Sequence, residues 1–450
     1  MNVAAPRQPA THQHAAIAPV AVEPAGIEPA AVEPAAFQLA DLHLPAGARV
    51  AVAMSGGVDS SVVAGLLVEA GFEVIGLTAR LSDAAPEATT RAGSCCAPRD
   101  ARDARAVAAK LGIRHYVIDE RERFADLVIA PFAAAWAAGL TPNPCVSCNR
   151  HLKFDLLLER ARLVGAVALC TGHYARLAPD AAGRWQLRRG ADPDKDQAYF
   201  LHPLRPEAAG SLRFPLGAMS KADVRAHARR LGLAVAEKPE SMDICFTGGR
   251  PPGDWLSQRP EIKARAGGGV LVALDGTRLG SHAGQHRFTI GQRRGHGVAG
   301  GGGPLYVVAK ESDGAVVLGD LAALTVAEVD VADAGTIDGA PLVEGAFALA
   351  QWRHRGEQRL AQVMRATADR WTLRFVEPAL AIAPGQSLVL TDAEGPDAGV
   401  RLLGGGVVAG TRRPGAPAEP ASTADVALAS PIADAAPQAR AAVPTGGWGP

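Results

Sequence analysis

The chain has 450 residues, and its 46 Lys and Arg balance its 46 Asp and Glu. Zero net charge excludes any argument for a nucleic-acid partner from bulk charge, although it leaves room for a local basic patch. Six cysteines in this length exclude a disulfide scaffold, and no apolar run is long and uncharged enough to predict a transmembrane helix. We therefore expect a cytoplasmic protein without membrane contact, divided into about three domains.

The two ends of the chain have the composition of disordered tails. Residues 1–45 are rich in Ala, Pro and Glu with a crude AVEP repeat, and frequent proline forbids a long helix. No basic stretch with a following apolar core is present, so the segment does not read as a signal peptide. Residues 406–450 are similar in composition. Both segments are therefore predicted to lie outside the folded domains.

Apolar strands and amphipathic helices alternate through the first part of the remaining chain. Expected strands cover residues 49–54, 73–78, 115–119 and 166–170, and expected helices cover 62–70, 101–110, 123–138 and 153–163. This order predicts a parallel sheet with helices on both faces and with ligands at the carboxyl ends of its strands. From about residue 251, short Val and Leu runs predict a small mixed domain and then an all-β barrel or sandwich. The expected domains are 46–210, 211–330 and 331–405.

A glycine-rich loop, Ser55-Gly-Gly-Val-Asp-Ser-Ser61, joins the first expected strand to the first helix. Glycines let the backbone approach a phosphate group, and the start of a helix offers unpaired N–H groups. Asp59 can only accept hydrogen bonds, so it fits either a divalent cation such as Mg²⁺ or a brace of the loop. The chain has no GxxxxGK[ST] motif, which excludes a Walker A loop. The pattern predicts a phosphate loop of a different type.

Cys145 and Cys148 form a CxxC pair, and Cys245 follows about 100 positions later. A zinc site would need two more ligands, and no second CxxC or HxxxH is present. A thioredoxin-like pair would follow the first strand of a βαβ unit, which this pair does not. A sulfur-transfer pair, in which one thiol carries a persulfide and another resolves it, needs a distant cysteine that Cys245 can supply. A helix opening at Asn149 would place Cys148 near its positive end, where the pKa of a thiol falls; Cys170, in an apolar strand, is expected in the core.

Six motifs occur in a fixed order between Arg49 and Leu403: SGGVDSS, NPCxxCNxxxKF, TGHYA, DxxKDQxYFL, PESMDICF and HxGQHRFTIGQRRG. The first resembles the PP-loop of the ATP pyrophosphatases. Together the six resemble the bacterial tRNA-specific 2-thiouridylases, the MnmA family of that superfamily. The resemblance implies a PP-loop, adenine nucleotide alpha-hydrolase-like parallel-sheet domain that binds ATP, then a small mixed central domain and a C-terminal β-barrel.

The resemblance also implies an activity, that of an ATP-dependent tRNA-uridine 2-sulfurtransferase. With ATP and Mg²⁺, the family adenylates the C2 oxygen of wobble uridine 34, and a cysteine persulfide supplies the sulfur of 2-thiouridine. The implied partners are the tRNAs for Lys, Glu and Gln and a sulfur-relay or cysteine desulfurase donor; a monomer is expected. The rival functions are an amide-forming PP-loop ligase, which would need no distant cysteine pair, and a non-catalytic scaffold, against which the intact SGGVDSS argues.

Residue by residue, the resemblance assigns catalysis to Cys148 and to Cys245, the persulfide carrier, with a disulfide between them. Whether Cys148 attacks or only resolves stays open. The implied ATP-binding residues are Ala53, Met54, Ser55, Gly56, Gly57, Val58, Asp59, Ser60, Ala79 and Gly172. The implied tRNA-binding residues are Asn143, Pro144, Cys145, His173, Lys195, Asp196, Gln197, Arg353, His354 and Gln386.

Cys145 departs from the family pattern, because many members have Asp at this position. An Asp could take part in acid–base chemistry, which a thiol performs poorly near neutral pH. Cys145, Cys148 and Cys245 could instead offer three thiolates to a [4Fe–4S] cluster. The alternative is that Cys145 is a tolerated variant.

Overall fold

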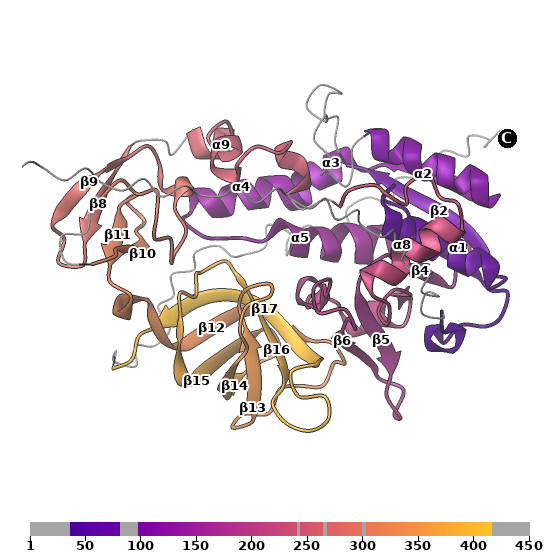
Figure 1. The fold of residues 1–450 in the computed structure, drawn as a ribbon. Helices are drawn as coiled ribbons and strands as arrows, with labels where there is room; N and C mark the ends of the chain where they lie inside the picture. Colours follow the sequence, from indigo (N-terminus) through magenta and orange to yellow (C-terminus); the bar gives the residue numbers. More distant parts are fainter. Residues whose placement is uncertain (1–36, 82–97, 241–243, 264–267, 299–302, 416–450) are drawn as a thin grey trace, which may run out of the picture. The chain divides into compact units, whose positions relative to one another are not determined.

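A computed structural model describes residues 37–81, 98–240, 244–263, 268–298 and 303–415 of the chain (Figure 1). Most of the two expected tails lies outside these ranges, as do Cys95 and Cys96. None of the helices in the described ranges combines the length and apolar character that a bilayer crossing needs.

The first part of the chain forms the predicted parallel sheet. Its strands run in the order β3-β2-β1-β4-β7, and every pairing is parallel. Their bounds are β1 Arg49–Ala53, β2 Glu73–Arg80, β3 Arg114–Asp119, β4 Ala168–Cys170 and β7 Leu212–Arg213. The fold class expected from alternating strands and helices is confirmed. The fifth strand escaped prediction because two residues are too few to show a periodicity.

Both faces of this sheet are covered, as its apolar strands require. Along β1, Val50 and Val52 pack into one core cluster with the helix α1, Val58–Glu69, whereas Ala51 packs into a second cluster with Phe154. Alternate residues of a strand point to opposite faces, so each face receives its own set of helices. The helices α2 Pro98–Leu111 and α8 Lys221–Arg230 contribute to the same cluster as α1.

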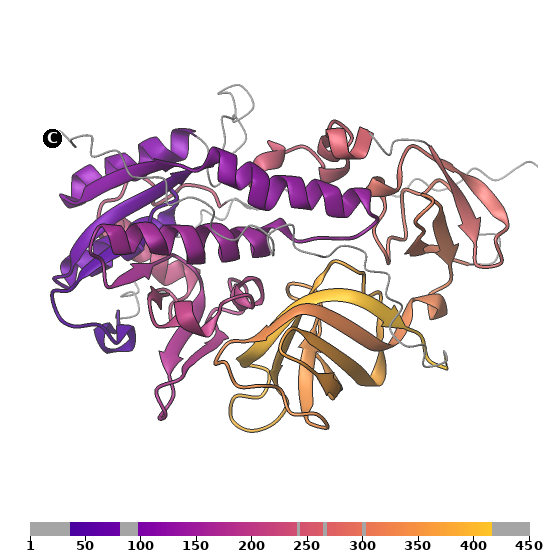
Figure 2. The ribbon, with the colours of Figure 1, turned by 180° about the vertical axis from the view of Figure 1, so that it is seen from behind.

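Two long helical segments follow β3 and lie side by side in both views (Figures 1 and 2). The first consists of α3 Arg121–Phe124, a π-helical turn Ala125–Ile129 and α4 Ala130–Ala137. The second consists of α5 Pro144–Ser147, a π-helical stretch Cys148–Leu157 and α6 Leu158–Leu163. The second segment leads into β4, and the CxxC pair lies at its start, with Cys145 in α5 and Cys148 as the first residue of the π-helical stretch.

The central region is the mixed sheet that the sequence predicts. Its strands run in the order β10-β11-β8-β9, with β11 and β8 parallel and the other pairs antiparallel. Their bounds are β8 Gly269–Ala273, β9 Arg278–His282, β10 Tyr306–Lys310 and β11 Val316–Gly319. The short helices α9 Pro252–Leu256 and α10 Pro260–Lys263 precede this sheet.

The last region is a closed β-barrel and not a sandwich. Six antiparallel strands run in the order β12-β15-β14-β13-β16-β17, and a further pairing of β12 with β17 closes the ring. Their bounds are β12 Thr325–Thr336, β13 Phe347–Gln351, β14 Arg359–Ala366, β15 Arg370–Leu380, β16 Ser387–Asp392 and β17 Arg401–Arg412. A hairpin from the first region, β5 Ala175–Pro179 and β6 Trp185–Arg189, extends this sheet where Leu187 pairs with Leu402.

The last strand of the barrel runs past the start of the tail that composition suggests. The strand β17 continues to Arg412, past the expected tail boundary at residue 405, through a run of three glycines. A Cβ at Gly404 would lie 2.1 Å from the Gly335 carbonyl oxygen, and one at Gly406 would lie 2.7 Å from that of Ala332. The run therefore permits close strand approach, where composition suggested a linker. Since β7 and α8 pack with the first sheet, we also propose that the first domain continues past residue 210.

Candidate functional site

The phosphate loop, Ser55–Ser61, is held in shape by its own side chains. Ser60 Oγ accepts from the Ser55 backbone N–H at 3.1 Å, and Ser61 Oγ donates to the Gly57 carbonyl at 2.8 Å. Gly56 has φ +72°, and a Cβ there would lie 2.1 Å from the Asp100 carbonyl oxygen. Only glycine fits this position, so the loop can turn sharply at the carboxyl end of β1 and lead into α1.

Asp59 acts as a brace of this loop. Tyr174 Oη donates to Asp59 Oδ1 at 2.8 Å, and Lys221 Nζ donates to both carboxylate oxygens at 2.7 and 2.9 Å. Burial first, and then the Asp59 carboxylate, raise the pKa of Tyr174, so the phenol stays a donor. Of the two roles considered for Asp59, the brace is therefore the one that the contacts show.

The end of β4 meets the phosphate loop from the neighbouring strand. A Cβ at Gly172 would lie 2.9 Å from the Ser60 backbone nitrogen, so this glycine, like Gly56, allows close packing. The buried ring of His173 lies next to it, with Nδ1 2.6 Å from Thr171 Oγ1 and Nε2 3.2 Å from Lys153 Nζ. Burial and then the Lys153 charge lower the pKa of His173 well below its usual value, so the ring is neutral near pH 7.

The helix that carries the CxxC pair begins at Pro144, earlier than the predicted start at Asn149. Asn143 is its N-cap, since Asn143 Oδ1 accepts from the Cys145 backbone N–H at 3.1 Å. Asn before Pro is a strong helix-start signal that the sequence offered and the prediction missed. Cys145 is exposed in the first turn, and Cys148 is half-buried one turn later, where the helix becomes π-helical. Such π-helical segments are frequent at functional sites.

Cys245 and Cys148 contact the same apolar cluster, although about 100 positions separate them in the sequence. We call it the Leu152 cluster; its buried members are Leu81, Phe124, Val128, Leu152 and Leu156. Ala79, an expected ATP-binding residue at the end of β2, packs against it as well. The fold thus brings the two predicted catalytic cysteines to one place beside the nucleotide-binding edge of the sheet.

The three cysteines of the iron–sulfur hypothesis do not form a metal site in this arrangement. Among the described residues, which include Cys145, Cys148 and Cys245, no group of three His, Cys, Asp or Glu side chains could hold a metal ion. The donor set of the described residues therefore does not fit a [4Fe–4S] cluster. Cys170 is fully buried in β4, and burial raises the pKa of its thiol to about 12, so the prediction that it belongs to the core is confirmed.

The expected tRNA-contacting segment Lys195-Asp196-Gln197 makes internal contacts. Lys195 Nζ pairs with Glu240 Oε2 at 2.7 Å. Asp196, which is buried, accepts from Arg189 Nη1 at 2.8 Å, and Gln197 Oε1 accepts from the Tyr174 backbone N–H at 3.1 Å. These contacts tie the segment to the phosphate-loop region on one side and to the barrel on the other.

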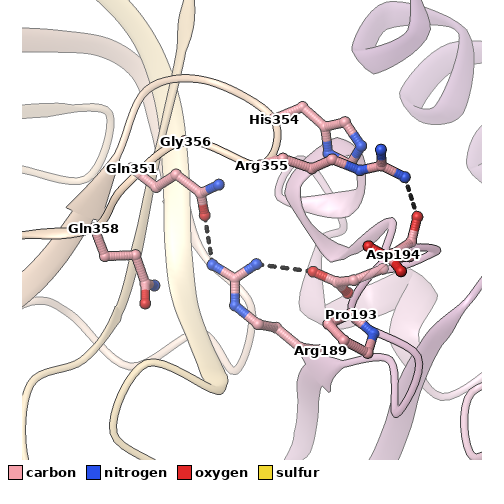
Figure 3. Close-up of a pocket in the computed structure, with 9 residues that line it drawn as sticks. Arg189, Pro193, Asp194, Gln351, His354, Arg355, Gly356 and Gln358 are labelled. Atoms are coloured by element: carbon pink, nitrogen blue, oxygen red, sulfur yellow. Dashed lines mark hydrogen bonds and ion pairs between the residues drawn. The ribbon is translucent and has the colours of Figure 1, made fainter. Parts of the chain in front are cut away.

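A polar cavity of about 330 Å³ lies where this segment meets the barrel (Figure 3). Arg189 crosses it and also donates to Gln351 of β13. His354, an expected tRNA contact, lines the cavity, and its ring lies 4.5 Å from that of Phe200. The other two expected barrel contacts bond to the barrel backbone: Arg353 Nη2 donates to Ala381, and Gln386 Oε1 accepts from Ala383.

Three matches to family models cover most of the described chain. Residues 48–249 match the tRNA methyl transferase HUP domain, residues 261–319 match the tRNA methyl transferase PRC-barrel domain, and residues 343–408 match the Aminomethyltransferase beta-barrel domain. These three spans follow the parallel sheet, the mixed sheet and the closed barrel in order.

Proteins that match over most of their own length show to which family the chain belongs. A tRNA-specific 2-thiouridylase MnmA from Rhizorhabdus wittichii is 47% identical over 368 residues, covering 81% of this chain and 93% of that protein. The MnmA of Azorhizobium caulinodans is 45% identical over 379 residues, covering 82% and 95%. This chain belongs to the tRNA-specific 2-thiouridylase MnmA family. The methyltransferase wording of all three models describes single domains, whereas each of these MnmA matches covers more than four fifths of this chain.

Solved structures add little to this assignment. The NH3-dependent NAD synthetase from Campylobacter jejuni is 17% identical, with a TM-score of 0.27 over 44% of this chain and 69% of that one. Membership of the MnmA family therefore rests on the sequence matches and on the order of the three regions.

Several charged residues beside the phosphate loop were missed in the sequence. Lys221, Lys238 and Glu240 were not singled out, although each contacts the loop or a residue bonded to it. Lys221 and Asp59 are 162 positions apart, so no local sequence pattern predicts their contact. Only Glu240 offered a signal, because it belongs to the PESMDICF motif.

Proposed function

We propose that this chain is an ATP-dependent tRNA 2-thiouridylase that converts wobble uridine 34 to 2-thiouridine. The observation that carries the proposal is the contact of Cys148 and Cys245 with one apolar cluster beside the phosphate loop. An amide-forming ligase of the same superfamily would leave this pair of cysteines without a role. Membership of the MnmA family supports the same choice.

The first chemical step is activation of the uridine. The C2 oxygen attacks the α-phosphorus of ATP, the bond to the bridging oxygen breaks, and pyrophosphate leaves. The phosphate loop would hold the polyphosphate with its backbone N–H groups and the start of α1. Mg²⁺ bound with ATP would neutralise phosphate charge, while Asp59 stays paired with Tyr174 and Lys221 as a brace of the loop. Lys221 and Lys238 lie where they can offset the remaining negative charge.

The second step replaces oxygen by sulfur. The terminal sulfur of a Cys245 persulfide attacks C2, and AMP leaves with the C2 oxygen. The Cys148 thiolate then attacks the Cys245 sulfur, which frees the thiouridine and leaves a Cys148–Cys245 disulfide for a thiol reductant to reopen. In the alternative order, Cys148 attacks the persulfide first and hydrosulfide is the nucleophile at C2. Either order requires Cys148 and Cys245 to approach each other, which the Leu152 cluster favours.

The expected substrates are the tRNAs for Lys, Glu and Gln. The segment Asn143–Cys145 would approach the target base, which has to leave its stack. His173, Lys195–Gln197, Arg353, His354 and Gln386 remain proposed tRNA-facing positions, and their internal contacts predict that some of them rearrange when tRNA binds. Contacts from these residues to tRNA phosphates would position the RNA without reading its sequence.

Reconstitution tests the proposal directly. The purified protein is incubated with unmodified tRNA, Mg²⁺, ATP and a persulfide-loaded cysteine desulfurase, and the digested nucleosides are measured by mass spectrometry. We expect 2-thiouridine at position 34 of the Lys, Glu and Gln tRNAs only when ATP is present. Release of pyrophosphate without 2-thiouridine, or thiolation without ATP, would contradict the proposal.

A further inference from the structure

The helical segment that carries Cys148 also carries a lysine, Lys153, to which the mechanism above gives no role. Between Cys148 and Leu157 this segment is π-helical, so its backbone hydrogen bonds join residues five positions apart. Lys153 lies five positions after Cys148 and therefore about one turn further along nearly the same side of the helix. An α-helix, with about 3.6 residues per turn, would direct these two side chains to different sides.

Burial of its two neighbours fixes the backbone at Lys153. Leu152 is 1% exposed in the Leu152 cluster, and Phe154 is 3% exposed in the core cluster that contains Ala51. Lys153 is half-buried between them, and Lys153 Nζ lies 3.2 Å from His173 Nε2. The side chain of Lys153 therefore runs from the Cys148 helix to the chain that follows β4.

The buried ring of His173 is oriented to accept a hydrogen bond from Lys153. An ammonium group can only donate, so His173 Nε2 has to be the acceptor at 3.2 Å. A neutral ring then carries its hydrogen on Nδ1, which donates to Thr171 Oγ1 at 2.6 Å. Phe154 and Phe214 pack edge-on against the ring, with centroids 6.4 and 5.6 Å away. His173 is therefore a fixed acceptor that holds the Lys153 ammonium group in place.

The chain after β4 lies between Lys153 and the phosphate loop. Gly172 packs so closely against the loop that a Cβ there would lie 2.9 Å from the Ser60 backbone nitrogen, and Tyr174 Oη donates to a carboxylate oxygen of the loop at 2.8 Å. The residue between these two, His173, meets Lys153 instead. Consecutive residues of one short segment therefore contact the loop and hold the lysine.

The order of the strands places the phosphate loop and Lys153 on the two sides of one ligand position. From β1 the sheet continues to β2 and β3 in one direction, and to β4 and β7 in the other. Ligands of parallel sheets bind outside the carboxyl ends of the strands at such a change of direction. The phosphate loop follows β1 and the Lys153 contact follows β4, so a nucleotide bound between these strands meets both.

We propose that Lys153 is a catalytic residue that donates a hydrogen bond to the α-phosphate of ATP, and that His173 positions its ammonium group. The inference rests on the proposed function for the identity of the reactants. When the C2 oxygen of the uridine attacks the α-phosphorus and pyrophosphate leaves, negative charge builds up on the non-bridging oxygens of the α-phosphate. An ammonium group already fixed beside these oxygens stabilises this charge without reorganising at the moment of reaction.

The same contact serves the second step, and no proton is transferred through it. AMP leaves with the C2 oxygen and keeps its α-phosphate, so the hydrogen bond from Lys153 is retained while sulfur takes the place of oxygen. Since Lys153 and Cys148 lie on nearly the same side of the helical segment, the phosphate contact also brings the activated uridine toward the Cys148 thiol. One helical segment thus supplies a charge for activation and a thiol for sulfur transfer.

Binding of AMP and of pyrophosphate tests the proposal without tRNA or a sulfur donor. Each is titrated calorimetrically into the full-length protein with Mg²⁺, because AMP contains the α-phosphate whereas pyrophosphate corresponds to the part that the phosphate loop holds. Lys153→Met keeps the length of the side chain and removes its charge. It should weaken AMP binding about ten-fold, as for the loss of one charge-assisted hydrogen bond, and leave the affinity for pyrophosphate unchanged.

Steady-state release of pyrophosphate with tRNA and ATP measures the catalytic contribution. The kcat of Lys153→Met should fall by about 10²-fold or more, since a preorganised donor to a developing charge is lost. Lys153→Arg should recover part of the rate, and His173→Leu, which removes the acceptor, should lower kcat about ten-fold. In Lys153→Ala, added methylammonium should raise kcat about ten-fold, an effect that a lysine supporting only the fold would not show.

The matched control is Lys110→Met, because Lys110 is exposed in the last turn of α2. It should bind AMP and release pyrophosphate as the wild type does. If Lys153→Met does not fold, Lys153→Gln takes its place with the same expected results. Equal AMP affinity in Lys153→Met and the wild type, or equal weakening of AMP and pyrophosphate binding, overturns the proposal. Failure of the proposed function is seen separately, as wild-type protein that makes no 2-thiouridine, and the comparison of AMP with pyrophosphate stays decisive in that case.

Discussion

The phosphate loop and the Leu152 cluster lie at the same edge of the sheet but are assembled in different ways. The loop consists of seven consecutive residues that bond to one another, and its bonds to the rest of the chain come from the polar groups of Tyr174, Lys221 and Lys238. The Leu152 cluster joins residues from β2, from both long helices and from the segment after Glu240, and apolar packing holds it. The loop is therefore a fixed element, whereas the placement of the cysteines depends on contacts between distant segments.

This difference predicts that the two halves of the reaction can be separated by mutation. Changes in the phosphate loop should abolish activation of the uridine and therefore also the sulfur transfer that depends on it. Changes at the cysteines should leave activation intact and abolish sulfur transfer. Measuring pyrophosphate release and 2-thiouridine in the same samples distinguishes the two classes.

Cys245→Ser should have the largest effect on thiolation. A hydroxyl cannot carry a persulfide, so 2-thiouridine formation should fall by about 10³-fold or more, as for the loss of a nucleophile. Release of pyrophosphate with tRNA should change little. Cys170→Ala is the control, because Cys170 is buried in β4 away from the Leu152 cluster, and it should retain both activities. Loss of pyrophosphate release in Cys245→Ser would show that the two halves are not separable.

Gly56→Ala should disable the phosphate loop. A methyl group would lie 2.1 Å from the Asp100 carbonyl at φ +72°, so the loop has to distort, and nucleotide affinity should fall at least about ten-fold. Gly71→Ala has the same kind of backbone, φ +81°, with nothing within 4 Å, and separates the steric clash from backbone strain. It should lower stability by about 1–2 kcal/mol and leave nucleotide affinity unchanged. Equal affinity losses in both variants would contradict the steric account.

The contrast between the two regions also explains what the sequence could predict. The phosphate loop is local, so its residue types and its position between a strand and a helix were enough to find it. The packing of Cys148 and Cys245 against one cluster could be anticipated only from sulfur-transfer chemistry and from the family resemblance, because no spacing rule joins residues so far apart. The Lys221–Asp59 contact had no signal at all, since it exists only after α8 packs beside α1.

Composition was misleading at the end of the barrel. The expected tail begins at Gly406, yet Gly406 and the residues up to Arg412 belong to β17, where neighbouring backbones approach closely. Glycine is thus compatible both with a disordered tail and with a crowded strand. Only the close approach of the neighbouring strand β12 shows that the crowded strand applies here. Missing the helix start at Asn143–Pro144 was a different kind of error, because the N-cap Asn and the following Pro were visible in the sequence.

The ion pairs of Glu240 with Lys195 and Lys221 should titrate, whereas the aromatic contacts of Phe246 with Phe124, Phe132 and Trp255 should not. Burial opposes ionisation of Glu240, but hydrogen bonds from Lys195 and Lys221 outweigh it and lower the pKa of Glu240 to about 2. The pKa of Glu240 is lower in the folded chain than the ordinary value of 4.5, so the ionised carboxylate stabilises the fold at pH values above 4.5. This stabilisation is lost as the pH falls from 4.5 toward 2. After allowance for solvent screening, we expect a contribution of about 1–2 kcal/mol near pH 7.

Urea unfolding of the wild type and of Glu240→Gln measures this contribution. The difference in unfolding free energy should be constant from pH 7 to pH 5.5 and should shrink below pH 4.5. Phe246→Leu, which removes the aromatic contacts of Phe246, should show a difference from the wild type that does not change with pH. A constant difference for Glu240→Gln down to pH 3.5 would mean that Glu240 is not held by charge.

Tyr174→Phe should have the smallest effect on nucleotide affinity, because more than one group holds Asp59 in place. The variant removes the hydrogen bond from Tyr174 Oη to Asp59, but Lys221 still holds both carboxylate oxygens. One hydrogen bond is worth about 1 kcal/mol, so nucleotide affinity should fall no more than about five-fold. Tyr199→Phe is matched, because this buried phenol donates to the Ser387 carbonyl of the barrel, and it should reduce stability without changing affinity. A loss of affinity as large as that of Gly56→Ala would show that the shape of the phosphate loop depends on Asp59 more than on its glycines.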